Sequence, residues 1–195
     1  MPYQFTFLKD NKPEFECDLK KLQCEHINPN NQHRCRRYKF IGCGLCWQHL
    51  ESDRHLKIKP STLPNAGLGL FAYDKNGYPD ILFRKDDFVI KYNGEHISNL
   101  QLNNRYGGNE ATAPYAVEIK SGYNEDAACQ RTPASLVNRK SRTKANARLS
   151  TNFKFVMIKA TKNIRNGDEI FVDYGKKYKM SQPGYSFQTK YYRSN

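Results

Sequence analysis

The chain has 195 residues, of which 38% are hydrophobic and 13% aromatic, and its formal net charge is +13 at pH 7. This apolar content is enough for a folded core and excludes a wholly disordered chain, while no apolar run approaches the roughly 20 residues of a membrane-spanning helix. The excess of Lys and Arg favours polyanionic partners, although a solvated basic surface without a partner gives the same count.

The cysteines are concentrated near the N-terminus. Five of the six lie in the first fifty residues, namely Cys17, Cys24, Cys35, Cys43 and Cys46. The segment from Met1 to Lys9 lacks the apolar stretch and cleavage site of a secretory signal, so we expect a protein that is not secreted. In that setting, clustered cysteines indicate a metal site rather than a disulfide framework. Free thiols packed as small hydrophobic side chains are the alternative.

A zinc site is predicted from the spacing Cys24-x10-Cys35-x10-Cys46-x2-His49. Three thiolates and one imidazole form the closed tetrahedral set that is typical of structural zinc. Cys46 and His49 are one turn apart on a short helix expected over 44–50, and an exposed loop is expected over 28–33. Three further residues remain alternative ligands: Cys17, His26 and Cys43.

We predict that residues 1–54 form a Cys/His-rich zinc-binding module. A segment this short buries little apolar surface, so bound metal would supply much of its stability. A basic, Pro-flanked stretch over 54–64 is predicted to join this module to a second domain.

The rest of the chain favours a fold that is mainly β with short helices. Short β-branched or aromatic runs alternate with Gly and Asn turns, which predicts strands over 69–72, 88–92, 115–119, 153–159 and 169–172. Ser98 is predicted to cap a short helix over 98–106, with Leu100 and Leu102 on its apolar side.

Four segments in chain order carry the most specific signal. They are 65–72 (NAGLGLFA), 92–97 (YNGEHI), 135–139 (SLVNR) with 145–147 (ANA) after it, and 164–175 (IRNGDEIFVDYG). Phosphate loops, zinc-protease helices and serine-nucleophile elbows have other signatures, which the sequence lacks.

This ordered series resembles the SET-domain protein lysine methyltransferases over about residues 55–180. The resemblance implies a β-fold of small sheets in which the third and fourth segments thread together as a pseudoknot. It also implies S-adenosyl-L-methionine on one face and a narrow channel for the substrate lysine on the other. We therefore predict a SET catalytic domain over 55–178 and an aromatic and basic C-terminal tail over 179–195.

The resemblance also implies roles for single residues. Tyr174 matches the family's catalytic tyrosine and Tyr92 a wall of the lysine channel, although both types of position also occur as ordinary strand tyrosines. The residues expected to bind the cofactor are Leu68, Gly69, Leu70, Tyr115, Asn138, Arg139 and Tyr178.

The sequence departs from the family pattern at several points. Arg139 stands where the family usually has His, and Ala145–Asn146 stands for its Pro–Asn pair after a slightly longer loop. No cysteine follows Cys129, so the family's zinc-binding cysteines after the SET domain are missing. Four aromatic residues of the tail are expected to form a lid over the cofactor and the lysine channel in their place. The alternative is an exposed apolar tail without such a role. The four residues are Tyr178, Tyr185, Phe187 and Tyr191.

The expected activity is N-methylation of protein lysine, above all histone lysine in nucleosomes, with structural zinc as a second cofactor. A non-histone substrate or an inactive SET-like scaffold that binds chromatin or nucleic acid is the alternative. Basic clusters at 139–148 and 176–179 are expected to contact DNA, and acids are expected to line a groove for a basic tail: Glu95, Glu118, Glu125, Asp126 and Asp173. No membrane partner is expected. The protein is expected in the nucleus or on chromatin. Because the compact form also resembles small viral SET proteins, the host nucleus or the virion is expected if the protein is viral.

Overall fold

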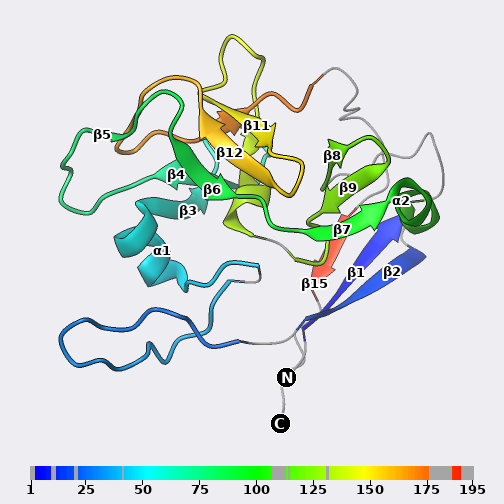
Figure 1. Cartoon of the computed structure of the whole chain (residues 1–195), viewed down its shortest axis with the longest axis horizontal. Coiled ribbons are helices and arrows are strands. Elements are labelled where there is room, and N and C mark those ends of the chain that lie inside the picture. Colours follow the sequence, from blue (N-terminus) through cyan, green and yellow to red (C-terminus); the bar gives the residue numbers. More distant parts are fainter. Residues whose placement is uncertain are drawn as a thin grey trace.

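The structure is a computed structural model that describes residues 3–9, 12–19, 22–40, 42–106, 113, 115–130, 132–175 and 186–189. Its α-helices are α1 (Trp47–Arg54) and α2 (Asn99–Tyr106), and one 3-10 helix, η1, covers Pro133–Leu136. No helix in this described part is long and apolar enough to cross a membrane. Strands supply most of the remaining regular structure, so the predicted mainly β fold is confirmed (Figure 1).

The strands are short and form several small sheets. In the first half of the chain they are β1 (Tyr3–Lys9), β2 (Lys12–Leu19), β3 (Leu56–Pro60), β4 (Leu68–Ala72), β5 (Ile81–Phe83), β6 (Phe88–Lys91) and β7 (Glu95–Ser98). In the second half they are β8 (Ala116–Lys120), β9 (Tyr123–Asp126), β10 (Asn138–Arg139), β11 (Ala147–Thr151), β12 (Val156–Ala160), β13 (Ile164–Arg165), β14 (Phe171–Val172) and β15 (Ser186–Thr189).

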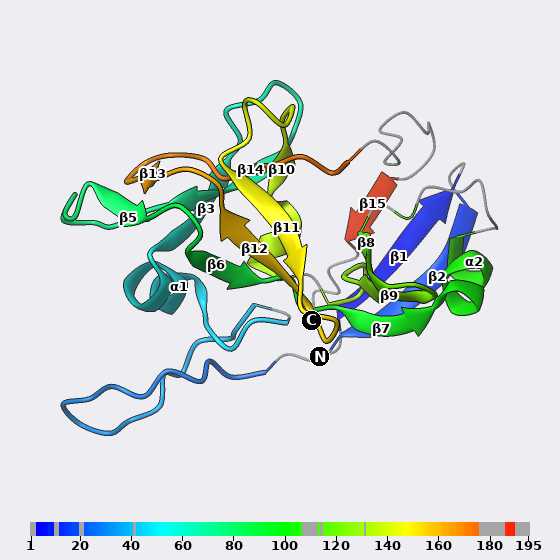
Figure 2. The ribbon, with the colours of Figure 1, turned by 45° about the horizontal axis from the view of Figure 1, so that its top comes forward.

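The sheets lie in two groups (Figure 2). One group holds the antiparallel sheet β11–β12–β6 with the pairs β3–β4 and β13–β5 and the parallel pair β10–β14. The other holds the sheets β7–β9–β8 and β15–β1–β2. The parallel pair joins the third and fourth sequence motifs, so segments more than thirty residues apart lie side by side where the resemblance places its pseudoknot.

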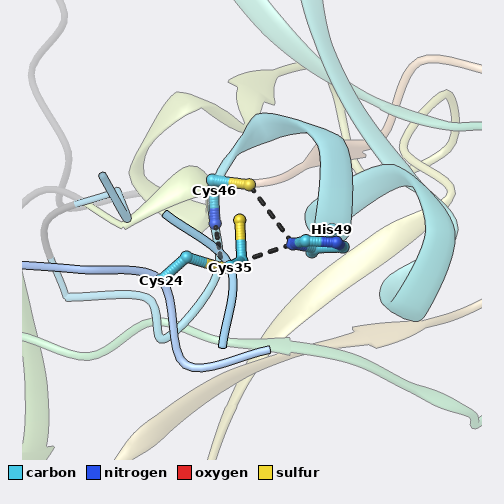
Figure 3. Close-up of side chains that lie close together, drawn as sticks. All are labelled: Cys24, Cys35, Cys46 and His49. Atoms are coloured by element: carbon cyan, nitrogen blue, oxygen red, sulfur yellow. Dashed lines mark hydrogen bonds between the residues drawn. The ribbon is translucent and has the colours of Figure 1, made fainter. Parts of the chain in front are cut away.

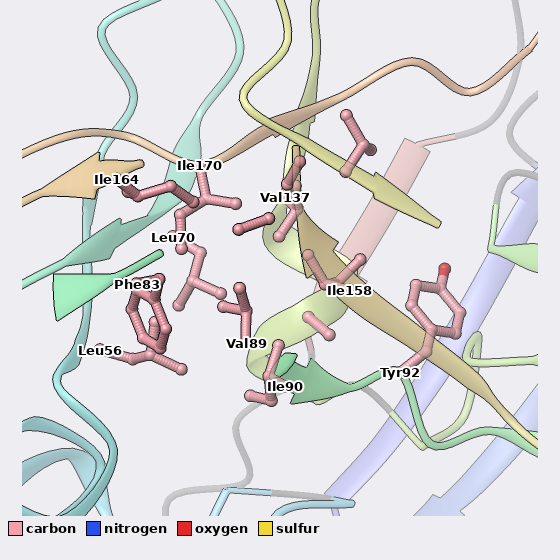
Figure 4. Close-up of a cluster of buried hydrophobic side chains, with 14 of the residues drawn as sticks. Leu56, Leu70, Phe83, Val89, Ile90, Tyr92, Val137, Ile158, Ile164 and Ile170 are labelled. Atoms are coloured by element: carbon pink, nitrogen blue, oxygen red, sulfur yellow. The ribbon is translucent and has the colours of Figure 1, made fainter. Parts of the chain in front are cut away.

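The hydrophobic core lies within the first group of sheets (Figure 4). Along β12, Val156, Ile158 and Ala160 are fully buried, while the residues between them are half-buried, which is the period-two pattern of a strand with one face on a core. Leu56 of β3 and Leu70 of β4 are also fully buried, and they belong to the same hydrophobic cluster as the buried residues of β12.

Ile158 gives a direct test of this core. The Ile158→Ala variant is expected to lower the free energy of unfolding by about 2–5 kcal/mol, because the side chain is fully buried and its removal leaves a cavity. Leu100→Ala is the control, with an expected change below about 0.5 kcal/mol, since Leu100 is 69% exposed. Urea unfolding of both variants measures the difference, and equal losses would contradict the assigned core.

Several elements differ from the sequence predictions. The stretch 54–64 is not only a join, because Leu56–Pro60 forms β3 and pairs in register with β4. The strand expected over 153–159 begins later, at Val156, since Phe153 has a positive φ of 67° and lies in an exposed turn. Ser98 does cap α2, accepting the Gln101 N–H at 3.2 Å, but Leu100 points to solvent. The helix expected over 44–50 runs from Trp47 to Arg54.

The Cys/His-rich segment packs onto the rest of the molecule. Leu50 of α1 is 1% exposed and belongs to the main core. At the other end of the segment, the Asn93 side-chain amide donates a hydrogen bond to the Gly42 carbonyl. Gly42 has φ of +68°, and a Cβ there would lie 2.7 Å from Thr132 Cγ2, so this close approach requires glycine. The segment therefore supports the loop that follows Tyr92, and the boundary at residue 54 stays a prediction.

Candidate functional site

Four side chains in the N-terminal segment form a metal-binding geometry (Figure 3). One ligand atom from each of Cys24, Cys35, Cys46 and His49 lies within 4.8 Å of the others. His49 Nδ1 is 3.4 Å from the Sγ atoms of both Cys24 and Cys46. Ordinary zinc bond lengths in a tetrahedron put sulfur and nitrogen ligands about 3.6 Å apart, so this donor set fits structural zinc.

Local structure explains why these four meet. Residues 22–40 form a hairpin-like ladder in which the Cys24 N–H bonds to the Arg37 carbonyl at 2.8 Å and the Cys35 N–H to the His26 carbonyl at 2.9 Å. Cys46 precedes the first turn of α1, and His49 lies within that turn. Backbone N–H groups of Cys46 and Arg37 donate to the sulfurs of Cys24 and Cys35 at 3.3 and 3.4 Å, which supports thiolates in a metal site.

Two of the alternative ligands, His26 and Cys43, lie outside this donor set. The His26 ring stacks on the His49 ring with centroids 3.6 Å apart, and its Nδ1 is 2.6 Å from the Asp53 carboxylate. Cys43 packs against the hydrophobic core, and burial raises the pKa of its thiol. The side chain of Cys17, on β2, lies outside the described residues. The quartet selected from spacing is thus the group that the structure brings together.

The first and third sequence motifs meet at Asn138. Its side-chain amide donates to the Leu68 carbonyl at 3.0 Å, which ties β10 to the start of β4. Gly69 lies against the Glu169 carboxylate and the Asn138 amide, because a Cβ at this position would clash with Glu169 Oε1 and lie 3.3 Å from Asn138 Nδ2. Leu68 is 49% exposed, whereas Leu70 is fully buried in the core. Leu70 can therefore contact a cofactor only through its main chain. Leu68, Gly69 and Asn138 together form one edge of the domain, which runs from exposed to buried residues.

Glu169 holds this edge together, and sequence reasoning assigned it no role. Its carboxylate accepts hydrogen bonds from Ser61 Oγ at 2.7 Å, from the backbone N–H and hydroxyl of Thr62 at 2.7 and 2.6 Å, and from the Asn138 amide at 3.1 Å. The side chain is only 5% exposed. The fourth motif contains Glu169, but its partners are more than thirty residues away, so the sequence around it gave no sign of this role.

The ionised form of Glu169 contributes to stability. Burial opposes its ionisation, but the bonds from Thr62, Ser61 and Asn138 outweigh burial and lower its pKa from the ordinary value of 4.5. A lowered folded-state pKa gives stability that is present above about pH 4.5 and is lost as the pH falls through the lower folded value.

The Glu169→Gln variant tests this contribution. We expect it to lose about 1–3 kcal/mol of unfolding free energy at pH 7. The amide NH2 of glutamine would face N–H and O–H groups that now donate hydrogen bonds to the carboxylate. Its stability should also fall less steeply than that of the wild type below about pH 4.5. Urea unfolding across this pH range measures both effects. If the unfolding free energies of the two proteins fell equally steeply at low pH, the role of the ionised carboxylate would be contradicted.

Asn146 joins the third motif to the fourth. Its amide nitrogen donates to the Glu169 carbonyl at 2.9 Å, and its amide oxygen accepts the Phe171 N–H at 2.8 Å. The side chain thus replaces strand hydrogen bonds on both sides of Ile170. This position retains the family's asparagine, although Ala145 stands before it in place of proline.

Tyr174 lies beside the same edge. Its hydroxyl donates to the Val137 carbonyl at 2.6 Å, one residue before Asn138, and its ring packs against the core. Because the hydroxyl donates its proton in this bond, its oxygen can serve only as an acceptor toward any other group.

Tyr92 and Tyr115 form a second contact at the border of the same core. Tyr92 is 7% exposed, and its hydroxyl donates to the Tyr115 carbonyl at 3.2 Å. The Gly94 N–H bonds to the Glu125 carboxylate at 2.8 Å, which fixes the turn after Tyr92. The Tyr115 ring packs partly buried against the core. Tyr92 and Tyr174, which follow β6 and β14, therefore border one hydrophobic cluster.

Comparison with protein families identifies the fold. Residues 79–175 match the model of the SET domain. The chain belongs to the SET-domain family. The match begins after β3 and β4, which pair with each other and contact Asn138, inside the matched residues, through the Leu68 carbonyl.

Solved structures of a polycomb complex share the SET fold of this chain. One is ctPRC2 in an autoinhibited conformation bound to S-adenosylmethionine, at 26% identity and a TM-score of 0.50 over 64% of this chain and 16% of that one. Others are the Chaetomium thermophilum Polycomb Repressive Complex 2 bound to GSK126, at 25% identity and a TM-score of 0.50 over 64% and 16% of the two chains, and a humanized mutant with the same inhibitor, at 26% identity and a TM-score of 0.50 over 63% and 15%. The present chain spans less than a fifth of those chains. No curated protein matches the sequence significantly.

Two cationic residues directly follow Asn138 and lie against residues of the fourth motif. Arg139 Nε is 3.8 Å from the carboxylate of Asp173, the residue before Tyr174. The ammonium of Lys140 lies 3.7 Å from the centroid of the Phe171 ring. The positive charge at the family's histidine position is thus partly neutralised. The predicted cofactor contact of Tyr178 and the lid residues Tyr185 and Tyr191 lie outside the described residues, as does the side chain of Phe187.

The expected acidic groove is not built from the five predicted carboxylates. Glu125 and Asp126 are fully buried, and they bond to backbone N–H groups and to the Arg105 and Tyr106 side chains. Glu95 is paired with Arg105 at 2.8 Å. Of the five, only Glu118 is exposed. The sequence could not distinguish these cases, because strand periodicity does not show which acids are held by distant cations.

Proposed function

We propose that this SET domain is an S-adenosylmethionine-dependent protein-lysine N-methyltransferase. The observation that carries the proposal is the meeting of the Leu68 carbonyl, the Asn138 amide and the Tyr174 hydroxyl, which come from three motifs and converge beside one core. Their residue types match the positions that bind cofactor and orient substrate in the family. A related structure is described as bound to S-adenosylmethionine, which supports the same cofactor here.

S-adenosylmethionine would supply an activated methyl group on a sulfonium centre. Leu68, Gly69 and Asn138 would hold the cofactor through main-chain and amide contacts, with Arg139 beside them and Tyr115 on the cofactor side. The Tyr174 hydroxyl donates to Val137, so its oxygen would act as the acceptor toward the lysine amine or the polarised methyl. This fixed acceptor would position the neutral amine in line with the methyl carbon, where catalysis depends mainly on orientation.

Tyr92 would form part of the wall of the lysine channel. Its hydroxyl is anchored on the Tyr115 carbonyl, which fixes the ring. An aromatic wall suits both the aliphatic stem of lysine and the cationic head of its methylated product.

We propose a histone in nucleosomes as the substrate, and therefore a nuclear or chromatin-associated protein. The net charge of +13 supports a complex with a nucleic-acid-containing substrate better than one with an isolated basic tail. We also propose one structural zinc ion on Cys24, Cys35, Cys46 and His49, which would brace the loop after Tyr92 through the contact between Gly42 and Asn93.

A substrate panel tests this function. The protein is incubated with labelled S-adenosylmethionine and, in separate reactions, nucleosomes, free histones and a histone-depleted lysate. Label on nucleosomal histone lysine is expected, and label only in the lysate would instead assign a non-histone substrate. No label anywhere, together with no calorimetric binding of the cofactor, would leave a SET-like scaffold. The charge of Arg139, at the family's histidine position and 3.8 Å from the Asp173 carboxylate, is the feature that favours this outcome.

A further inference from the structure

The zinc-binding segment exposes a cationic and aromatic surface that the methyltransferase site does not use. We define this surface by Arg36, Arg37 and Trp47, all of which are exposed, with Trp47 at 56%. The Arg37 guanidinium lies over the Trp47 ring, 5.9 Å from its centroid. An exposed indole beside two cations offers a ligand a stacking face together with positive charge.

The metal-binding residues hold this surface in place. Arg36 and Arg37 follow Cys35, and the Arg37 N–H donates to the Cys35 sulfur at 3.4 Å. Trp47 follows Cys46 directly and begins α1. The surface is therefore attached to two of the four metal-binding residues, Cys35 and Cys46. This attachment holds its backbone in place, so little order needs to be created on binding.

The charges of this segment favour an anionic partner. Among the described residues 22–54, each acid already has a partner: Glu25 pairs with Lys39, Asp53 with His26 at 2.6 Å, and Glu51 with Lys57 at 3.3 Å. Within the described part of the chain, no carboxylate lies within the 4.0 Å ion-pair distance of Arg36 or Arg37. Their charges are thus available to phosphate groups.

We propose that Arg36, Arg37 and Trp47 bind single-stranded nucleic acid. The two guanidinium groups would contact successive phosphates, and an unpaired base would stack on the exposed indole. An acidic peptide would use the cations but not the flat aromatic face. A duplex would satisfy the phosphate contacts, but its bases are already stacked. This binding is independent of methyl transfer at Tyr174.

Trp47 is the only tryptophan of the chain, so its fluorescence reports on this surface alone. The full-length, zinc-loaded protein is titrated with a single-stranded oligothymidylate, with a duplex of equal length and with an acidic peptide. Saturable quenching by the single strand is expected, and it should persist unchanged in Tyr174→Phe. Absence of quenching by the strand, or stronger quenching by the duplex or the peptide, would overturn the proposal.

Variants locate the binding site. The double variant Arg36→Ala/Arg37→Ala is expected to bind the strand about 10-fold or more weakly and to lower the slope of log K against log salt by about 1.4, since each phosphate contact contributes about 0.7 for single strands. Arg84→Ala/Lys85→Ala removes the same charge from the exposed turn after β5, and its affinity should stay within about twofold of the wild type.

Trp47→Leu provides the second variant, measured by the anisotropy of a labelled strand. Loss of one stacked base predicts about 5- to 100-fold weaker binding. Metal analysis confirms that each variant still holds one zinc per chain. Equal weakening by the control pair, or full affinity in Trp47→Leu, would show that only net charge is sensed and would overturn the proposed surface.

Discussion

The Tyr174→Phe variant is expected to lower kcat for methyl transfer on the order of 100-fold or more. The hydroxyl is anchored on the Val137 carbonyl at 2.6 Å, beside Asn138, and no other atom of the ring can accept from the lysine amine or the methyl group. Removing a single preorganised hydrogen-bonding group from a reaction centre costs on the order of 10²–10³ in kcat. Single-turnover kinetics with labelled cofactor separate this step from binding.

Stability and cofactor affinity distinguish a catalytic from a structural role. Loss of one hydrogen bond should cost about 1 kcal/mol, or about 2–4 °C in Tm for a chain of this size. Calorimetric affinity for S-adenosylmethionine should change little, because the predicted contacts of Leu68 and Asn138 remain. Tyr78→Phe is a matched control, since Tyr78 is 81% exposed. A Tyr174→Phe enzyme that turns over at the rate of the control would remove Tyr174 from the mechanism.

Cys46→Ser is expected to abolish stoichiometric zinc binding and to lower Tm by about 8–16 °C. Cys46 is fully buried, and three ligands hold zinc far less tightly than four. Structural zinc sites contribute roughly 10–16 kcal/mol of binding free energy in isolated modules, so a loss of about 4 kcal/mol in the intact protein is a conservative expectation. Leu50 of α1 lies in the main core, so the damage should spread beyond the segment.

Cys43→Ser is the matched control for the metal site. Cys43 is also a free thiol, but it packs against the hydrophobic core rather than in the quartet. We expect this variant to retain one zinc per chain, measured by elemental analysis, and to lose stability only through burial of a hydroxyl. If Cys43→Ser lost its zinc and Cys46→Ser retained it, the ligand assignment would be wrong.

The four candidate metal ligands could be predicted because their residue types and their spacing are visible within one short segment of the sequence. Cys46 and His49 are separated by one helical turn, and three thiolates with one imidazole have few other uses together. The strands β4, β6 and β8 were also predictable, since β-branched and aromatic residues there lie between Gly and Asn turns. The order of the four motifs then indicated the SET family, which the family comparison confirms.

The central part of the site was not predictable from any local pattern. Glu169 binds Ser61 and Thr62 across more than a hundred residues, and nothing in its neighbours' sequence indicates these partners. The same holds for Asp126, whose burial is explained only by Arg105 and Tyr106. Strand β3 was missed because Lys57 and Lys59 alternate with Leu56 and Ile58, and the basic residues with Pro60 resembled a linker.

The most direct test of the account is the transfer of labelled methyl from S-adenosylmethionine to nucleosomes, with mass spectrometry to identify the modified side chain. The account predicts methyl groups on histone lysine with the wild-type protein and a loss on the order of 100-fold or more with Tyr174→Phe. Label that does not reside on lysine, or equal label with both proteins, would contradict it.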